Sequence, residues 1–146
     1  MVVLKHAMWT HGTSVQFENK SWELRALRQG FFTTVVPSNE STSGWVHFAI
    51  PTPVIIDDMR LKAQSALIRF STGPQASIGA IHVYDGETRI YQRNGIALTG
   101  NLQLDREVLP DVPEVKFGTG ISIQLNFDGT GAGAWIQLIS AGIDFV

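Results

Sequence analysis

The sequence has no cysteine among its 146 residues and few charged residues, 16% of the total. The absence of cysteine excludes a disulfide framework, a thiolate zinc site and a thiol nucleophile. The formal net charge is only −2, so the chain is not of the disordered class, in which high net charge accompanies low hydrophobicity. It also lacks the basic surface that nonspecific binding to nucleic acid requires.

Long apolar runs are missing as well. The first apolar run, residues 1–4, ends at Lys5 and His6, whereas a secretory signal needs about seven or more apolar residues. No stretch reaches the roughly 18 apolar residues of a membrane-spanning helix. We therefore expect a soluble protein that is not exported, cytoplasmic by default, with no membrane partner.

Short β-like runs separated by turn sequences recur along the whole chain. The runs are rich in Val, Ile, Phe, Trp, Tyr and Thr, which favour strands. The breaks contain turn-forming residues, among them Asp57-Asp58 and the hairpin signal Asp85-Gly86. The expected strands, besides those near the C-terminus, are residues 8–17, 22–27, 31–36, 45–50, 61–70, 77–84 and 88–93.

The clearest periodic signal covers residues 117–127, where apolar residues alternate with small or polar ones. This alternation predicts a strand with one face in the core. A Gly-rich break at 128–133 follows, and we expect residues 134–145 to return as the second arm of a hairpin. Because this arm is apolar on both faces, it is expected to lie centrally in a sheet. The residues predicted to point inward from the first arm are Phe117, Ile121, Ile123, Leu125 and Phe127.

Two other segments depart from the simple strand pattern. Residues 22–27 are expected to form a strand, and the alternative is two turns of helix over residues 21–28, ended by Gly30. Residues 101–116 are expected to form a long connection, because Pro110 and Pro113 interrupt the hydrogen bonding of both helices and strands.

These elements together predict an all-β fold. Regularly spaced short strands with turns between them are typical of an antiparallel β-sandwich of jelly-roll type, and a partly closed β-barrel is the alternative. The length of 146 residues corresponds to one domain, residues 1–146.

Two histidines are candidates for chemistry. His47 and His82 both lie in the middle of predicted strands, and their rings would converge if those strands were close. With Asp85 as a nearby carboxylate, they would form the kind of group that an enzyme uses for acid–base work. The alternative is a pair of hydrogen-bonded sheet residues. The sequence contains no His-x-His pair of the metal-binding type, so we expect neither a metal nor another cofactor.

Tryptophan is unusually frequent, with four residues in the chain. Trp9 is the most suggestive of them, because a small polar segment that includes His11 follows it. An exposed indole can stack on a sugar ring while neighbouring polar side chains bind its hydroxyl groups. The alternative is that the tryptophans belong to the core or to a subunit interface. The candidate ligand-binding residues are therefore Trp9, His11, His47, His82 and Asp85.

Four segments, residues 6–15, 44–55, 81–86 and 140–145, taken in this order, resemble an uncharacterised family of small β-rich proteins of bacteria and fungi. The likeness spans nearly the whole chain and implies one compact domain. It implies no reaction and no catalytic residue, because the family has no assigned function.

Three functions remain open at this point. The first is a noncatalytic binding or interaction module for carbohydrate or another small polar ligand. The second is an enzyme that uses His47 and His82 with a nearby carboxylate. The third is a structural subunit, since 44% hydrophobic residues and a positive mean hydropathy of +0.07 favour a homo-oligomer, a dimer or trimer, that buries apolar surface and sheet edges.

Overall fold

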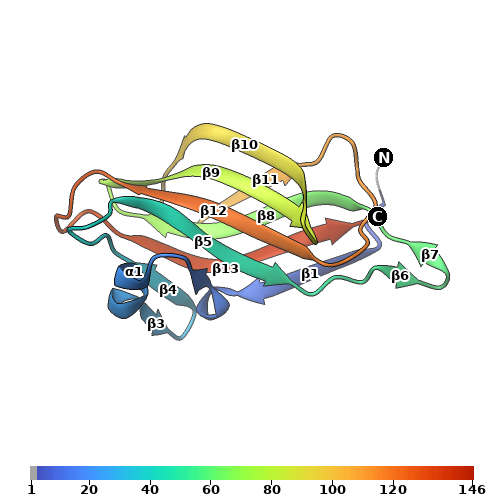
Figure 1. Ribbon diagram of the computed structural model, residues 1–146, viewed down its shortest axis with the longest axis horizontal. Coiled ribbons are helices and arrows are strands. Elements are labelled where there is room, and N and C mark those ends of the chain that lie inside the picture. The colour runs from blue at the N-terminus through green and yellow to red at the C-terminus, as the bar shows by residue number, and fades with distance from the viewer. Residues whose placement is uncertain (1–2) are drawn as a thin grey trace.

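Two antiparallel β-sheets, packed face to face, make up the computed structural model, which describes residues 3–146 (Figure 1). Sheet A consists, in order across the sheet, of β11 (Gln103–Val108), β8 (Ala63–Thr72), β13 (Ile136–Phe145), β4 (Phe32–Val35) and β3 (Leu27–Gln29), and β1 (His6–His11) also pairs with β13. Sheet B consists of β10 (Thr88–Leu98), β9 (Ala76–Asp85), β12 (Thr119–Phe127), β5 (Ser43–Ile50) and β2 (Gln16–Phe17).

Smaller elements connect these strands. A 3-10 turn, η1 (Gly12–Ser14), joins β1 to β2, and a helix, α1 (Lys20–Arg25), joins β2 to β3. A separate hairpin of β6 (Ile55–Ile56) and β7 (Met59–Arg60) projects from one end of the sandwich (Figure 1). Its turn consists of Asp57 and Asp58, both with positive φ, which confirms the turn predicted there.

The core lies between the two sheets and is built from alternate residues of the strands. In β12, Ile121, Ile123 and Leu125 are fully buried, whereas Ser122 and Gln124 point away from the core. A one-residue shift in the pairing of β12 would turn this apolar set toward solvent. The architecture is the antiparallel β-sandwich of jelly-roll type that the sequence predicts.

The predicted hairpin between residues 117–127 and 134–145 is wrong, because β12 and β13 lie in different sheets. Each of these strands is already hydrogen-bonded on both sides: β12 pairs with β5 and β9, and β13 pairs with β8 on one side and with β1 and β4 on the other. Neither has a free edge for the other. The Gly-rich segment 128–133 therefore belongs to the connection that leads from sheet B to sheet A. The central position predicted for residues 134–145 is confirmed.

The predicted inward position of Phe117 is also wrong. Its side chain is 73% exposed, and β12 begins only at Thr119. Between them, Gly118 has a φ of 121°, outside the range of an extended L-residue, so the alternating strand cannot run through it.

Residues 20–25 form α1 rather than the strand expected at 22–27. The side-chain oxygen of Asn19 accepts hydrogen bonds from the backbone N–H groups of Ser21 and Trp22, which caps the helix. Trp22 is fully buried with its ring edge-on to Phe127, at 5.3 Å between centroids, and its Nε1–H donates to the carbonyl of Ser41. One buried indole thus anchors a helix that has no apolar stripe.

The long connection expected at 101–116 contains a strand, β11, which pairs with β8 along its full length. Pro110 and Pro113 both follow the end of β11 at Val108, so they do not interrupt its hydrogen bonds. The described residues contain no helix with the length and apolar character that a membrane span needs.

Replacing Ile123 with Asp is expected to unfold the protein. An unpaired carboxylate in this fully buried position costs several kcal/mol, which is comparable to the whole stability of a domain. Gln124→Asp introduces the same charge at the next residue, on the outer face, and is expected to lower the unfolding midpoint only slightly. Thermal unfolding followed by circular dichroism measures both variants. An unchanged midpoint in Ile123→Asp would contradict the assigned register.

Candidate functional site

On the outer face of sheet B, β12 places Ser122 between two histidines. Ser122 lies opposite His47 of β5 on one side and opposite His82 of β9 on the other. Since neighbouring strands are about 5 Å apart, the two histidine backbones are about 10 Å apart. The two candidate histidines are therefore neighbours across a third strand and do not pair directly.

Both ring nitrogens of His47 have partners. Nε2 lies 2.7 Å from Oε1 of Glu18, just after β2, and Nδ1 lies 2.7 Å from the hydroxyl oxygen of Ser122. An ionised carboxylate only accepts hydrogen bonds, so Nε2 donates to Glu18, and in the neutral ring Nδ1 accepts the hydroxyl proton of Ser122. These two bonds fix the orientation of the imidazole.

His82 is held in a similar way on the other side of Ser122. Its Nε2 lies 2.7 Å from the side-chain oxygen of Asn94 in β10, which is an acceptor. In the neutral ring, Nδ1 is then a hydrogen-bond acceptor. The indole of Trp45 contacts the imidazole of His82, with ring centroids 4.7 Å apart. Because Trp45 belongs to β5 and His82 to β9, this contact spans β12.

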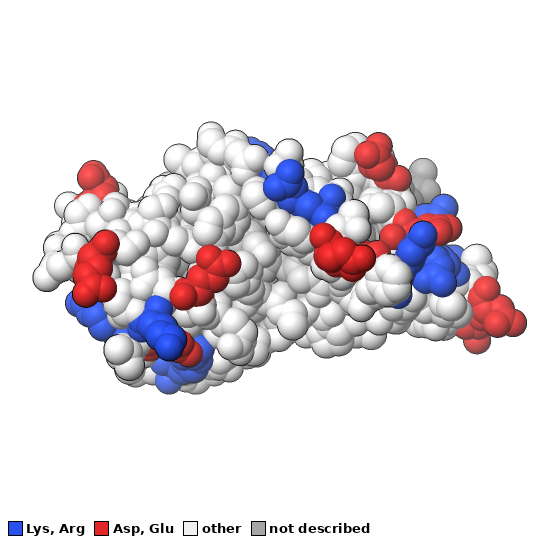
Figure 2. Space-filling model, in the orientation of Figure 1, with Lys and Arg blue, Asp and Glu red and all other residues white. Residues whose placement is uncertain are grey.

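These side chains surround a hollow of about 350 Å³, here called the central hollow. Its volume is within the range of small-ligand sites. In the view of Figure 2, uncharged residues cover much of this face of the molecule, and most charged side chains lie toward its borders. The lining of the central hollow is Glu18, Trp45, His47, His82, Tyr84, Arg89 and Ser122.

Asp85 does not take part in the central hollow. Its carboxylate is buried and accepts hydrogen bonds from the backbone N–H groups of Lys116, Phe117 and Gly118, at 2.9 to 3.2 Å. The role suggested for it beside the histidines is therefore corrected: it fixes the segment that leads into β12. The carboxylate that contacts a histidine is that of Glu18.

Trp9 and His11 lie on the other sheet. Trp9 is opposite Gly142 in the pairing of β1 with β13, and it is 43% exposed. Its indole covers Gly142, where a Cβ atom would come within 2.5 Å of the ring. His11 accepts a hydrogen bond from the backbone N–H of Thr13 and so caps η1. The structure does not bring either residue together with His47 or His82.

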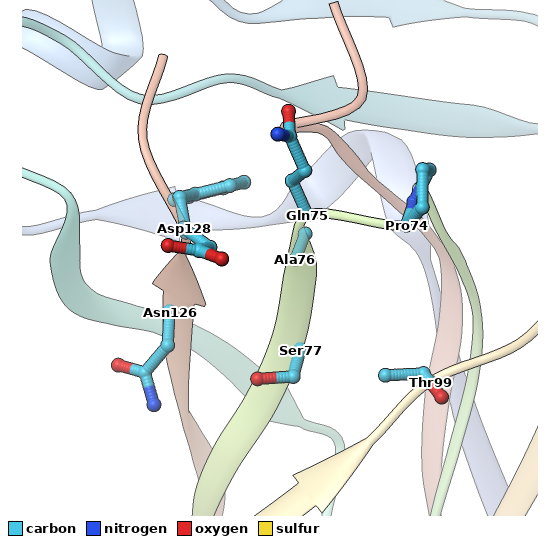
Figure 3. A pocket seen from close by; sticks show the side chains of 8 residues that line it. Pro74, Gln75, Ala76, Ser77, Thr99, Asn126 and Asp128 are labelled. Atoms are coloured by element: carbon cyan, nitrogen blue, oxygen red, sulfur yellow. The ribbon is translucent and has the colours of Figure 1, made fainter. Parts of the chain in front are cut away.

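A further hollow, of about 340 Å³, lies at one end of sheet B (Figure 3). Short polar side chains line much of it, among them Ser77, Thr99, Asn126 and Asp128. No Trp or Tyr is in its lining, and the one aromatic residue there, Phe127, is buried. It lacks the aromatic surface that distinguishes the central hollow.

Sequence reasoning missed most of the residues that accompany the two histidines. Tyr84 and Ser122 could have been found, because each lies two residues, or one cross-strand step, from a candidate histidine on the same face. Glu18 and Arg89 gave no such signal, since both come from edge strands or their ends, whose position depends on the tertiary fold.

Residues 3–146 match the model of a family described as a family of unknown function, DUF6623. The chain belongs to this family. The resemblance to an uncharacterised family noted in the sequence is thereby confirmed. A search of curated proteins finds no match to the sequence.

Solved structures show which fold the DUF6623 chain has. It is similar to the low-affinity xylan binding module CBM86 from Roseburia intestinalis, with a TM-score of 0.56, 8% identity and 97% of each chain covered. The xylan-binding module CBM15 gives a TM-score of 0.49 at 12% identity, with 99% of this chain and 94% of that chain covered. The catalytic unit of a GH87 α-1,3-glucanase from Streptomyces thermodiastaticus gives 0.48 at 11%, with 94% and 26% covered. We take the shared β-sandwich fold from CBM86.

The DUF6623 chain also buries a charged group away from the central hollow, between the edge strands β10 and β11. Glu107 is 3% exposed and binds Arg93, with the closest oxygen 2.9 Å from Nη1. Burial raises the pKa of the neighbouring Asp105 to about 6, and the charge of Glu107 adds to the rise. Within residues 3–146, no three His, Cys, Asp or Glu side chains are grouped to hold a metal ion.

Replacing Asp105 with Asn is expected to stabilise the protein at neutral pH. The pKa of Asp105 is about 6 in the folded state and about 3.9 in the unfolded chain, so the folded state binds more protons between these values. The contribution of Asp105 to stability is therefore greatest below pH 4 and is lost as the pH rises through 6. Asp105→Asn removes this loss and raises the midpoint at pH 7.5 by about 2–4 °C.

The control is Asp111→Asn, which neutralises an exposed carboxylate and is expected to leave the midpoint unchanged. Differential scanning calorimetry of both variants at pH 4 and pH 7.5 gives the comparison. A destabilised Asp105→Asn at pH 7.5 would show that the ionised carboxylate is favourable in its place.

Proposed function

We propose that this protein binds carbohydrate without catalysis, in the central hollow on the outer face of sheet B. The observation that carries the proposal is the combination of two aromatic side chains, Trp45 and Tyr84, with polar groups already held in place by the protein. Aromatic rings offer the apolar surface on which a sugar ring stacks, and the polar groups bind its hydroxyls.

The hydrogen-bonding groups of the central hollow suit hydroxyl ligands, which both donate and accept. Arg89 only donates, whereas Nδ1 of His82 and the second carboxylate oxygen of Glu18 only accept in the arrangement described. Ser122, whose proton is donated to His47, can accept from the ligand, and the hydroxyl of Tyr84 can both donate and accept. Because neighbouring residues orient His47 and His82, little conformational entropy is lost when a ligand binds.

The chain Ser122–His47–Glu18 has the order of nucleophile, base and carboxylate that hydrolases use. This observation favours the enzyme hypothesis, with Glu18 in place of Asp85. However, acyl transfer also needs hydrogen-bond donors for the oxyanion, usually backbone N–H groups. Ser122 lies mid-strand in β12, where the backbone pairs with β5 and β9 on both sides. We therefore favour binding over catalysis.

The CBM86 module, whose fold this chain shares, binds xylan. At 8% identity the likeness extends to the fold alone, so the proposal depends on the side chains of the central hollow. Xylan is nevertheless a sensible first probe.

Replacing Trp45 with Ala is expected to weaken binding to polysaccharide about tenfold or more, because the stacking surface is lost. Phe31→Ala also removes an aromatic side chain, one that is exposed and outside the central hollow, and is expected to leave binding unchanged. Affinity electrophoresis in gels that contain soluble xylan, mixed-linkage β-glucan, galactan or dextran compares the two variants with the unmodified protein. If none of these polysaccharides retards the unmodified protein, the proposed function is wrong.

We also propose that the chain forms a homo-oligomer, a dimer or trimer. The support is an exposed apolar group on the outer face of sheet A, where Trp9, Leu104 and Val108 are 43%, 55% and 49% exposed. Burying such a surface against a second copy is favourable. This face is opposite the central hollow, so assembly would leave the hollow open.

Light scattering coupled to size exclusion tests the oligomer. The expected mass is two or three times the 16.0 kDa of one chain. Leu104→Glu, in which a charge replaces an exposed apolar side chain, is expected to shift the mass toward that of one chain. A mass of one chain for the unmodified protein at micromolar concentration would rule out the oligomer.

A further inference from the structure

Another hollow, distinct from the one at the end of sheet B, adjoins the central hollow along β12. It has a volume of about 330 Å³, and its lining includes His47, Tyr84 and Ser122, which also line the central hollow. Beyond these shared residues it extends over Gly120 of β12 and Ala49 of β5, which lie opposite each other in the sheet. We call it the Gly120 hollow.

Gly120 is the second residue of β12, a central strand, and is paired with Ala49 on one side and with Tyr84 on the other. Glycine weakens a strand there, and such a residue often marks close approach of a ligand or of another backbone. A Cβ atom at Gly120 would have one neighbour within 4 Å, the carbonyl oxygen of Phe48 at 3.6 Å, which is ordinary contact. The fold therefore has room for a side chain at Gly120.

Two other strand glycines, Gly79 and Gly142, differ in this respect, whereas Gly95 of β10 has open space but a φ of 64°, which by itself favours glycine. A Cβ atom at Gly79 would lie 2.0 Å from the amide nitrogen of Asn126, and one at Gly142 would lie 2.5 Å from the indole of Trp9. Packing within the protein explains those two glycines. At Gly120 the missing side chain instead leaves space on the outer face, directly beside Tyr84, which is its partner in β9.

We infer that the Gly120 hollow is a second sugar subsite, and that the ligand is a saccharide of at least two consecutive units lying along β12. This inference rests on the proposed function. The ring of Tyr84 and the polar groups of His47 and Ser122 line both hollows, so they can contact two adjacent units of one chain. The absence of a side chain at Gly120 lets the second unit approach the backbone of the sheet.

The dimensions of the sheet agree with a saccharide chain that runs along β12. The outer face of β12 continues from Gly120, in the Gly120 hollow, to Gln124, which is opposite Trp45. The four residue steps of extended strand between them cover about 13 Å, which is longer than one sugar ring. A single monosaccharide would therefore leave part of the two hollows empty.

The test compares ligands of increasing length in variants that fill the Gly120 hollow. Isothermal titration calorimetry is carried out with xylose, xylobiose and xylotetraose and with glucose, cellobiose and cellotetraose. For the unmodified protein, the affinity is expected to rise about tenfold or more from the monosaccharide to the tetrasaccharide of the series that binds. Gly120→Val is expected to lose this gain with length, and Gly120→Ala to lose part of it.

Gly30→Val serves as the matched control. A Cβ atom at this exposed glycine meets nothing within 4 Å, and Gly30 lies outside both hollows. Gly30→Val is expected to retain the full gain in affinity with saccharide length. Thermal unfolding checks that the Gly120 variants are folded. The fold has room for the methyl group that Gly120→Ala adds, so this variant is expected to fold.

The outcomes separate this inference from the proposed function. If Trp45→Ala abolishes binding while Gly120→Val binds the tetrasaccharide as the unmodified protein does, the second subsite is wrong and the proposed function stands. If the unmodified protein binds the mono- and tetrasaccharide equally, the extended ligand is wrong. If it binds no saccharide of either series and no polysaccharide in the gels, the proposed function fails and this inference fails with it.

Discussion

The register of β12 between β5 and β9 decides both what the sandwich buries and what it presents outside. The same pairing that directs Ile121 and Ile123 into the core places Ser122 between two histidines on the outer face. A shift by one residue would disrupt both at once. The stability of the core therefore opposes the one-residue slip that would mispair the candidate site, because that slip also exposes the apolar residues.

Rigid support from neighbouring side chains is the second feature of the central hollow. Glu18 and Ser122 hold His47, and Asn94 holds His82. The supporting residues are Glu18, just after β2, Ser122 in β12 and Asn94 in β10, so the arrangement depends on the whole width of sheet B. A binding surface formed on a flat sheet in this way is more ordered than one formed on loops.

Features that depend on neighbouring residues in the sequence can be predicted from it, whereas features that depend on contacts between distant residues cannot. The alternation in β12 is a local pattern, so the sequence predicts it correctly, and the same holds for the central position of β13. Their pairing with each other was predicted wrongly, because sequence proximity says nothing about edges already occupied by distant strands. The helix at Trp22 depends on burial against Phe127, a contact across more than a hundred residues. Likewise, the sequence identifies His47 and His82 as strand residues but does not identify their partners. Asp85 is close to His82 in the sequence, yet its carboxylate binds backbone amides. Glu18 is far from His47 in the sequence, yet its carboxylate contacts the imidazole of His47.

The pairing of β1 with β13 has a consequence for how this protein can be joined to others. His6, at the start of β1, is opposite Phe145, at the end of β13, so the two ends of the described chain lie close together at one end of sheet A (Figure 1). Both strands belong to sheet A, whereas the candidate site is on sheet B. A fusion partner, a surface anchor or a fluorescent label attached at either end would thus extend from sheet A and leave the candidate site on sheet B free. Adjacent ends of this kind also permit the protein to be inserted as a unit into a loop of another protein.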